Sequence, residues 1–151
     1  MPKKTKDIQY YEAVGRRKEA VARARLYIVG RDKTASVYGA KQKQGTVLVN
    51  KIPLKTAYPS LMEQKMVMVP FVTTQTEDRF VVTLHTEGGG HSGQIQAIVH
   101  ALSRAIEKTD AATHRPILKH AKLLTRDART RERRKVGMGG KARRAKQSPK
   151  R

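Results

Sequence analysis

Hydrophobic and polar residues alternate in several stretches of the chain, as they do in β-strands with one buried face. The first two stretches cover residues 8–15 and 20–30 and are joined by a charged turn over residues 16–19. One face of the second stretch is small and aliphatic (Ala22, Ala24, Leu26 and Ile28). Its other face holds Arg23, Arg25 and Tyr27 outward, either as a solvated basic surface or as a surface suited to phosphate and sugar.

Two more strands are predicted at residues 46–50 and 79–87, and the second alternates cleanly with Phe80, Val82 and Leu84 on one side. Between them, Ser60 and Glu63 have the spacing of a capping box, which indicates the start of a short helix. Proline does not fit a helix interior, so we expect Pro70 to end this helix.

Residues 95–106 have the spacing of an amphipathic helix. Its apolar stripe consists of Ile95, Ile98, Val99, Leu102 and Ile106. Three alanines, at positions 97, 101 and 105, form a small-residue edge where a sheet can approach closely. Together these elements predict an α/β (α+β) fold, in which two main helices pack on a mixed sheet in a single domain.

Charge divides this chain of 151 residues into two zones. Its 33 Lys and Arg against 12 Asp and Glu give a formal net charge of +21, but only 2 acidic residues follow Ala112, against 15 basic ones. Beyond Arg129, Val136 and Met138 are the only aliphatic side chains of any size. We therefore expect a basic N-terminal segment (1–9), a globular body (10–125) and an extended basic tail (126–151). Within the tail, Arg134 to Arg151 should be disordered until a polyanion neutralises it.

Composition also excludes several classes of protein. Since cysteine is absent, disulfides and thiolate zinc sites are ruled out. The five histidines remain as possible metal ligands, but we expect no metal site. The longest apolar run, residues 66–72, is far shorter than the roughly 20 residues of a membrane span. The basic N-terminus has no apolar stretch typical of a signal peptide, so we expect synthesis in the compartment of use.

A glycine-rich turn, GGGHSGQ, precedes the amphipathic helix, and Gly88, Gly90 and Gly93 match the spacing of a dinucleotide-binding turn. Asp110 lies at the distance of the ribose-binding acid, but it is in the polar end of the helix and no second strand precedes it, so we expect no cofactor. No Gly-Lys-Ser/Thr follows, which excludes a P-loop. Two compatible explanations remain: a tight turn with close packing, or a helix N-terminus that binds an RNA phosphate.

Residues 88–106 resemble the signature of the small-subunit ribosomal protein nine family, bacterial type. The shared features are three glycines, Gly93-Gln94, small residues along one helix edge and Arg104-Ala105-Ile106. Residues 13–25, 124–133 and 141–151 agree as well, so the resemblance covers about Tyr10 to Arg151.

The resemblance implies a structural, non-catalytic protein in the head of the small subunit. Its partners would be the small-subunit ribosomal RNA, neighbouring head proteins and peptidyl-site tRNA, with the tail against the anticodon stem-loop and no membrane. It also implies a left-handed βαβ crossover, an exception to the usual hand. We expect a cytoplasmic ribosome of a bacterium, with an organellar ribosome as the alternative.

The candidate site residues implied by the resemblance fall into two groups of RNA contacts and the family signature turn. The ribosomal RNA group is Arg16, Arg17, Lys18, Arg23, Arg25, Arg126, Arg129, Arg131, Arg133 and Arg134. The tRNA group is Lys141, Arg143, Arg144, Lys146, Lys150 and Arg151. The signature turn is Gly88, Gly89, Gly90, Gly93 and Gln94.

The chain departs from the family pattern at two places. Near Ser148 it lacks the aromatic residue of many bacterial members, although the final Lys150-Arg151 is kept, so a charge contact is expected there rather than stacking. The segment 30–45 is also longer than usual and has no assigned function.

Three other functions compete with this one. A ribonuclease could use His85, His91 and His100 with Lys65, but these residues fall on separate predicted elements. A DNA-binding protein fits the charge, yet the best helix carries only Arg104 and Lys108 as cations and would read a major groove poorly. Binding to a membrane surface would require a cationic amphipathic helix with bulky apolar anchors, and the sequence contains no such pattern.

Overall fold

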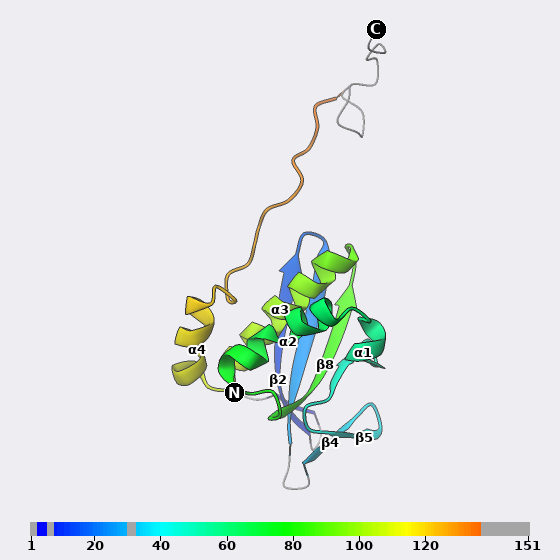
Figure 1. Cartoon of the computed structure of the whole chain (residues 1–151), viewed down its shortest axis with the longest axis vertical. Coiled ribbons are helices and arrows are strands. Elements are labelled where there is room, and N and C mark those ends of the chain that lie inside the picture. Colours follow the sequence, from blue (N-terminus) through cyan, green and yellow to red (C-terminus); the bar gives the residue numbers. More distant parts are fainter. Residues whose placement is uncertain (1–2, 6–7, 30–32, 137–151) are drawn as a thin grey trace.

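The computed structural model describes residues 3–5, 8–29 and 33–136, and its centre is a six-stranded mixed sheet (Figure 1). In spatial order its strands are β1 (Lys3–Thr5), β2 (Ile8–Arg17), β3 (Ala20–Ile28), β8 (Phe80–Glu87), β6 (Val47–Val49) and β7 (Ile52–Pro53). Neighbouring strands are antiparallel except β6 and β8, which run parallel. The mixed sheet expected from the sequence is therefore confirmed.

Four helices occur in the described part of the chain: α1 (Leu54–Ala57), α2 (Leu61–Thr74), α3 (His91–Glu107) and α4 (Ala111–His120). The two long helices, α2 and α3, lie over one face of the sheet, as the patterns predicted (Figure 1). The sequence patterns did not single out α4, which packs against both of them. The connection from β6 to its parallel neighbour β8 carries α1 and α2, and its left-handedness stays a prediction.

The main core lies between the helices and the sheet. Its fully buried members include Ala22, Ala24, Leu26, Leu84, Ile98, Leu102 and Ile106. The small-residue edge of α3 is also buried, and it lets β2 pass very close to the helix. A Cβ atom on Gly15 would overlap the Ala97 carbonyl oxygen and the Ala101 backbone nitrogen. Close approach of sheet and helix, expected from the alanine spacing, is confirmed.

A smaller core lies elsewhere on the sheet and corrects the expected outer face of β3. Tyr27 is buried together with Tyr10, Ala35, Val37 and Val81, whereas Ile28 is exposed. Ala35 and Val37 lie on β4 (Thr34–Val37), which pairs with β5 (Ala40–Lys43) in a hairpin. The expectation that the Tyr27 phenol faces outward is wrong, because the 33–43 hairpin covers this part of the sheet.

Helix α2 continues through Pro70 to Thr74, so the expected end at Pro70 is wrong. Pro70 and Phe71 are buried, and the core contacts of this last turn outweigh the backbone hydrogen bond that proline cannot make. The helix ends at Gln75, which has a left-handed φ of 54°. Ser60 stands at the N-cap as expected, but its side chain makes no capping hydrogen bond.

The glycine turn between β8 and α3 has the geometric role proposed for it. Gly88 and Gly89 have positive φ angles of 69° and 60°, and a Cβ on either would come within 2.8 Å of the backbone at Glu19 or Ala20. The Gln94 side chain closes the turn by donating to the Gly88 carbonyl oxygen (3.1 Å). Asp110 caps α4 through the Thr113 amide rather than lying in the end of α3, which corrects its expected place.

Candidate nucleic-acid interface

The tip of the β2–β3 hairpin carries the first group of expected RNA contacts. Arg16 and Arg17 pair in register with Val21 and Ala20, so the turn is shorter than expected and consists of Lys18 and Glu19. Side chains alternate across a strand, and consequently Arg16 is exposed while Arg17 is buried. Lys18 is exposed at the tip.

The start of the tail lies beside this hairpin tip. Arg126 lines a cavity of about 280 Å³ together with Arg16 and Arg17. Arg131 lines a second cavity, of about 570 Å³, together with Lys18 and the glycine turn. The fold therefore brings two stretches of expected RNA-binding cations, more than 100 residues apart, to the same end of the body.

Two of the expected contacts, Arg23 and Arg25, lie on the sheet in different surroundings. Arg23 is exposed. Arg25 donates to the Glu12 carboxylate at 2.8 Å, and its guanidinium lies 5.0 Å from the centre of the Tyr10 ring. Burial acts to lower the pKa of Arg25, but hydrogen bonds to Glu12 and Tyr27 raise it above its ordinary value. The charge of Arg25 is thus largely matched inside the protein, and Arg23 is the better candidate for phosphate.

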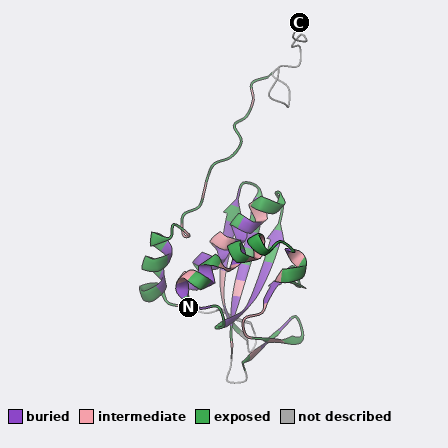
Figure 2. Ribbon diagram, viewed as in Figure 1, coloured by how far each residue is buried: buried purple, intermediate pink, exposed green. Residues whose placement is uncertain are grey.

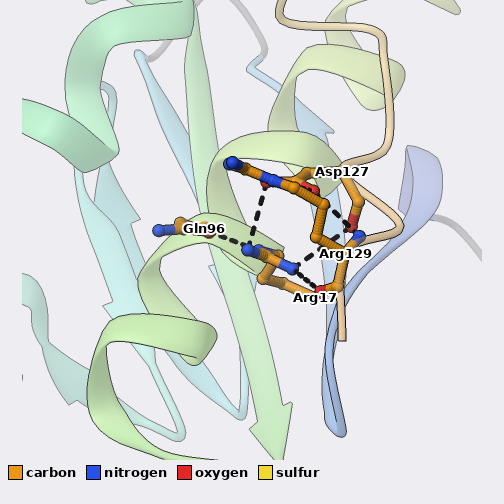
Figure 3. Close-up of polar contacts among 4 residues, drawn as sticks. All are labelled: Arg17, Gln96, Asp127 and Arg129. Carbon is orange, nitrogen blue, oxygen red and sulfur yellow. Dashed lines mark hydrogen bonds and ion pairs between the residues drawn. The ribbon is translucent and has the colours of Figure 1, made fainter. Parts of the chain in front are cut away.

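Arg17 is engaged within the protein (Figure 3). Its guanidinium contacts Gln96 of α3 and residues 127 and 129 at the start of the tail. Arg129 in turn binds the Asp127 carboxylate through its side chain, at 2.8 to 3.1 Å, and through its backbone amide. These hydrogen bonds from Arg129, side chain first, hold the pKa of Asp127 well below its usual range, so the carboxylate stays charged.

The remaining expected contacts lie further along the tail. Arg131 and Arg133 are exposed and Arg134 is half-buried. Residues 126–136 contain no helix or strand, and Figure 1 shows them running away from the body. The six expected tRNA contacts, from Lys141 to Arg151, lie outside the described residues, as does most of the segment expected to be disordered.

Sequence reasoning missed several polar residues that bind β2 from other elements. Gln96 and Asp127 hold Arg17, and Arg104 and Lys108 donate to the backbone oxygens of Val14 and Glu12 (2.6 and 2.7 Å). Asp127 had a signal, since it is one of two acidic residues after Ala112. Gln96 had no such signal in the sequence, because polar residues are common on the exposed faces of helices.

The histidines that a ribonuclease could use have separate local partners. His85 on β8 bonds to Glu87 (2.6 Å) and Asn50, and His91 at the start of α3 bonds to Glu63 (3.1 Å). His100 lies further along α3, and its Nδ1 atom is buried without a hydrogen-bond partner among the described residues. Lys65 is exposed on α2. Their contacts explain His85 and His91 as local structural groups, which weakens the ribonuclease hypothesis.

The part of the chain that the structure describes contains neither a group of metal ligands nor a membrane-spanning helix. Among these residues, no three His, Asp or Glu side chains come together as metal ligands. Within the same ranges, none of the helices combines the length and apolar character needed to cross a bilayer.

Comparison with known proteins places this chain beside one protein family and its members. The family model described as ribosomal protein S9/S16 matches residues 15–151. A small ribosomal subunit protein uS9 from Maridesulfovibrio salexigens is 41% identical over 136 residues, which cover 90% of this chain and 92% of the relative. The family match begins near the end of β2 and includes β3, β8, the glycine turn, α3 and the tail.

Proposed function

The chain belongs to the ribosomal protein S9/S16 family and is a structural protein of the small ribosomal subunit, and on this premise we propose that it binds ribosomal RNA and peptidyl-site tRNA through separate groups of cations. The body would dock on ribosomal RNA and beside neighbouring head proteins. The tail would hold tRNA phosphates. In this proposal the protein acts in a cytoplasmic ribosome of the bacterial type and needs no metal or cofactor.

One observation carries the ribosomal RNA part of the proposal. Arg16 and Lys18 from the hairpin tip, and Arg126 and Arg131 from the start of the tail, line two cavities at one end of the body. The N-terminus of α3 borders the second cavity and adds the partial positive charge of a helix dipole. A surface of this kind suits a folded RNA backbone, since arginine forks pair with phosphate oxygens and lysine supplies a point charge.

The tRNA part rests on the sequence of the tail and on the family. Lys141 to Arg151 would span roughly 35 to 40 Å if fully extended, enough to enter a crevice that no globular body fits. Six cations in this stretch can follow a phosphate backbone without reading bases. The cost of ordering such a segment is offset by the release of counterions from the RNA.

The test of the body surface is the salt dependence of binding to small-subunit ribosomal RNA. Replacing Arg16 and Lys18 by Met should lower the slope of log affinity against log salt by about 1 for each phosphate that is no longer neutralised. The matched control replaces Lys41 and Lys43, two exposed lysines of β5 that line neither cavity, by Met and removes the same charge. If the two double variants show equal slopes, the cations at the hairpin tip do not form the RNA surface.

A further inference from the structure

Arg17 is the last residue of β2, and its side chain is only 10% exposed. Burying a guanidinium is costly unless its donors are satisfied and its charge is matched. Arg16, its neighbour in the sequence, is exposed to solvent. The fold thus selects one of two adjacent arginines for an internal contact.

All three nitrogens of the Arg17 guanidinium have partners (Figure 3). Nε donates to Oε1 of Gln96 at 2.6 Å, and Nη1 donates to the carbonyl oxygens of Arg129 (2.5 Å) and Asp127 (3.4 Å). Nη2 lies 3.1 Å from Oδ2 of Asp127. One side chain therefore connects β2, α3 and the first residues of the tail.

The Asp127 carboxylate joins this arrangement from the tail side. It accepts hydrogen bonds from the backbone amide and the guanidinium of Arg129, so residues 127–129 form a closed local structure. Just before it, Leu123 and Leu124 pack against the main core. Beyond it, Thr130 to Lys135 contain no helix or strand.

We propose that Arg17, Gln96, Asp127 and Arg129 form an exit clamp, which fixes the point and the direction in which the tail leaves the body. Arg17 is then a positioning residue, whose effect on tRNA comes through the tail, and this role rests on the proposed function of the tail. Arg16, rather than Arg17, is the phosphate contact at this position.

The physical basis is the reach of a flexible chain. With the clamp closed, the last tail residue held on the body is Arg129; with the clamp open, it is Leu124. A longer free segment spreads its tip over a larger volume and lowers the effective concentration of that tip at any one site. More residues must then be ordered when the tail binds, which costs additional backbone entropy for each of them.

A direct phosphate contact by Arg17 fits the geometry less well. A phosphate would have to displace the Asp127 carboxylate and two backbone carbonyl groups from a guanidinium that is already enclosed. The same carboxylate would repel the incoming phosphate. Both effects favour the internal role.

The clamp can be tested in the free, full-length chain, where the absence of cysteine makes paired spin labels straightforward. Labels would be placed at Glu77→Cys, exposed on the body, and Thr130→Cys, exposed just after the clamp. Pulsed electron resonance should give one narrow distance distribution for the parent chain and a broad one for Arg17→Met. Asp127→Asn changes a partly exposed group, and should broaden the distribution even if Arg17→Met does not fold.

Two further variants separate positioning from charge. Arg16→Met removes the same charge from the adjacent residue and should keep the narrow distribution. Arg17→Lys keeps the charge but lacks the planar fork of donors, so it should give an intermediate width. A distribution as narrow in Arg17→Met and Asp127→Asn as in the parent chain would overturn the clamp.

A second measurement separates the clamp from the function of the tail. In reconstituted small subunits, Arg17→Met should weaken peptidyl-site tRNA binding by about 3- to 10-fold, as expected for a tethered segment whose effective concentration falls. Lys41→Met serves as the charge control. If the distance distribution broadens but tRNA binding is unchanged, Arg17 does not position the tail. If instead deletion of residues 141–151 leaves tRNA binding unchanged, the tail function fails, and the distance measurements still decide whether the clamp exists.

Discussion

His100 lies on α3, next to the segment that leads into the tail. Burial lowers the pKa of its ring, a hydrogen bond with the Leu124 backbone acts in the opposite direction, and the nearby charges of Arg104 and Arg126 lower it further. The net effect is a pKa below the ordinary value of 6.5. His100 is therefore a neutral structural residue at neutral pH.

This environment predicts an acid-sensitive stability. Below about pH 6.5 the unfolded chain protonates His100 while the folded chain does not, so the free energy of unfolding falls as pH drops from 6.5 toward the lowered folded pKa. His100→Gln should reduce that decline, measured as the urea midpoint between about pH 7.5 and about pH 5.5. His120→Gln, at an exposed position on α4, should keep the parental pH dependence. Equal pH dependence in His100→Gln and the parent would contradict the assignment.

At the scale of elements, the contact between β2 and α3 organises the body. Gly15 faces Ala97 and Ala101 so closely that the backbones nearly touch, and the glycine turn packs in the same way against the β2–β3 hairpin. The hairpin tip and the N-terminus of α3 consequently have a fixed relation. The proposed RNA surface, which uses both, is built on rigid elements.

Gly15→Ala should therefore destabilise the body strongly. Its Cβ would meet backbone atoms of α3, which cannot move without shifting the helix, so the free energy of unfolding should fall by about 1–3 kcal/mol or more. Urea unfolding of the full chain measures this change. Gly90→Ser is the control, since Gly90 has an ordinary φ of −104° and open space around it. A parental midpoint for Gly15→Ala would show that the sheet and helix can separate at low cost.

At the scale of the whole molecule, the tail leaves the body at the end where basic residues gather. The body has a packed core and a basic end, and the described part of the tail leaves from that end and is exposed along most of its length (Figure 2). Our proposal gives the two parts different tasks: the body takes its place in the subunit, and the tail reaches tRNA. Loss of the tail should then affect tRNA more than assembly.

Deleting Lys141 to Arg151 should leave incorporation into small subunits largely intact but weaken peptidyl-site tRNA binding. The deletion removes six cations, so the salt dependence of tRNA affinity should become shallower by up to about 1 for each phosphate that the tail neutralises. Affinity would be measured over a range of salt concentrations, with sedimentation as the measure of incorporation. The same affinity at every salt concentration would refute the proposed role of the tail.

By itself the sequence determined which segments form the main elements and which family the chain resembles. Alternation in β3 and β8 and the apolar stripe of α3 are local properties, because the period of side chains follows from backbone geometry. The alanines at positions 97, 101 and 105 have helical spacing and therefore share one edge of the helix. Small side chains along such an edge allow a neighbouring element to pack closely against it. The concentration of cations after Ala112 also follows from composition alone.

The tertiary structure decided which residues are buried and which distant residues they contact. Pro70 stays within a helix because its last turn is buried, and Tyr27 is buried because residues of the hairpin that follows β3 pack against it. Of the two adjacent arginines, only Arg17 meets Asp127, 110 positions along the chain. Such contacts depend on how the elements pack together, and no local pattern carries that information.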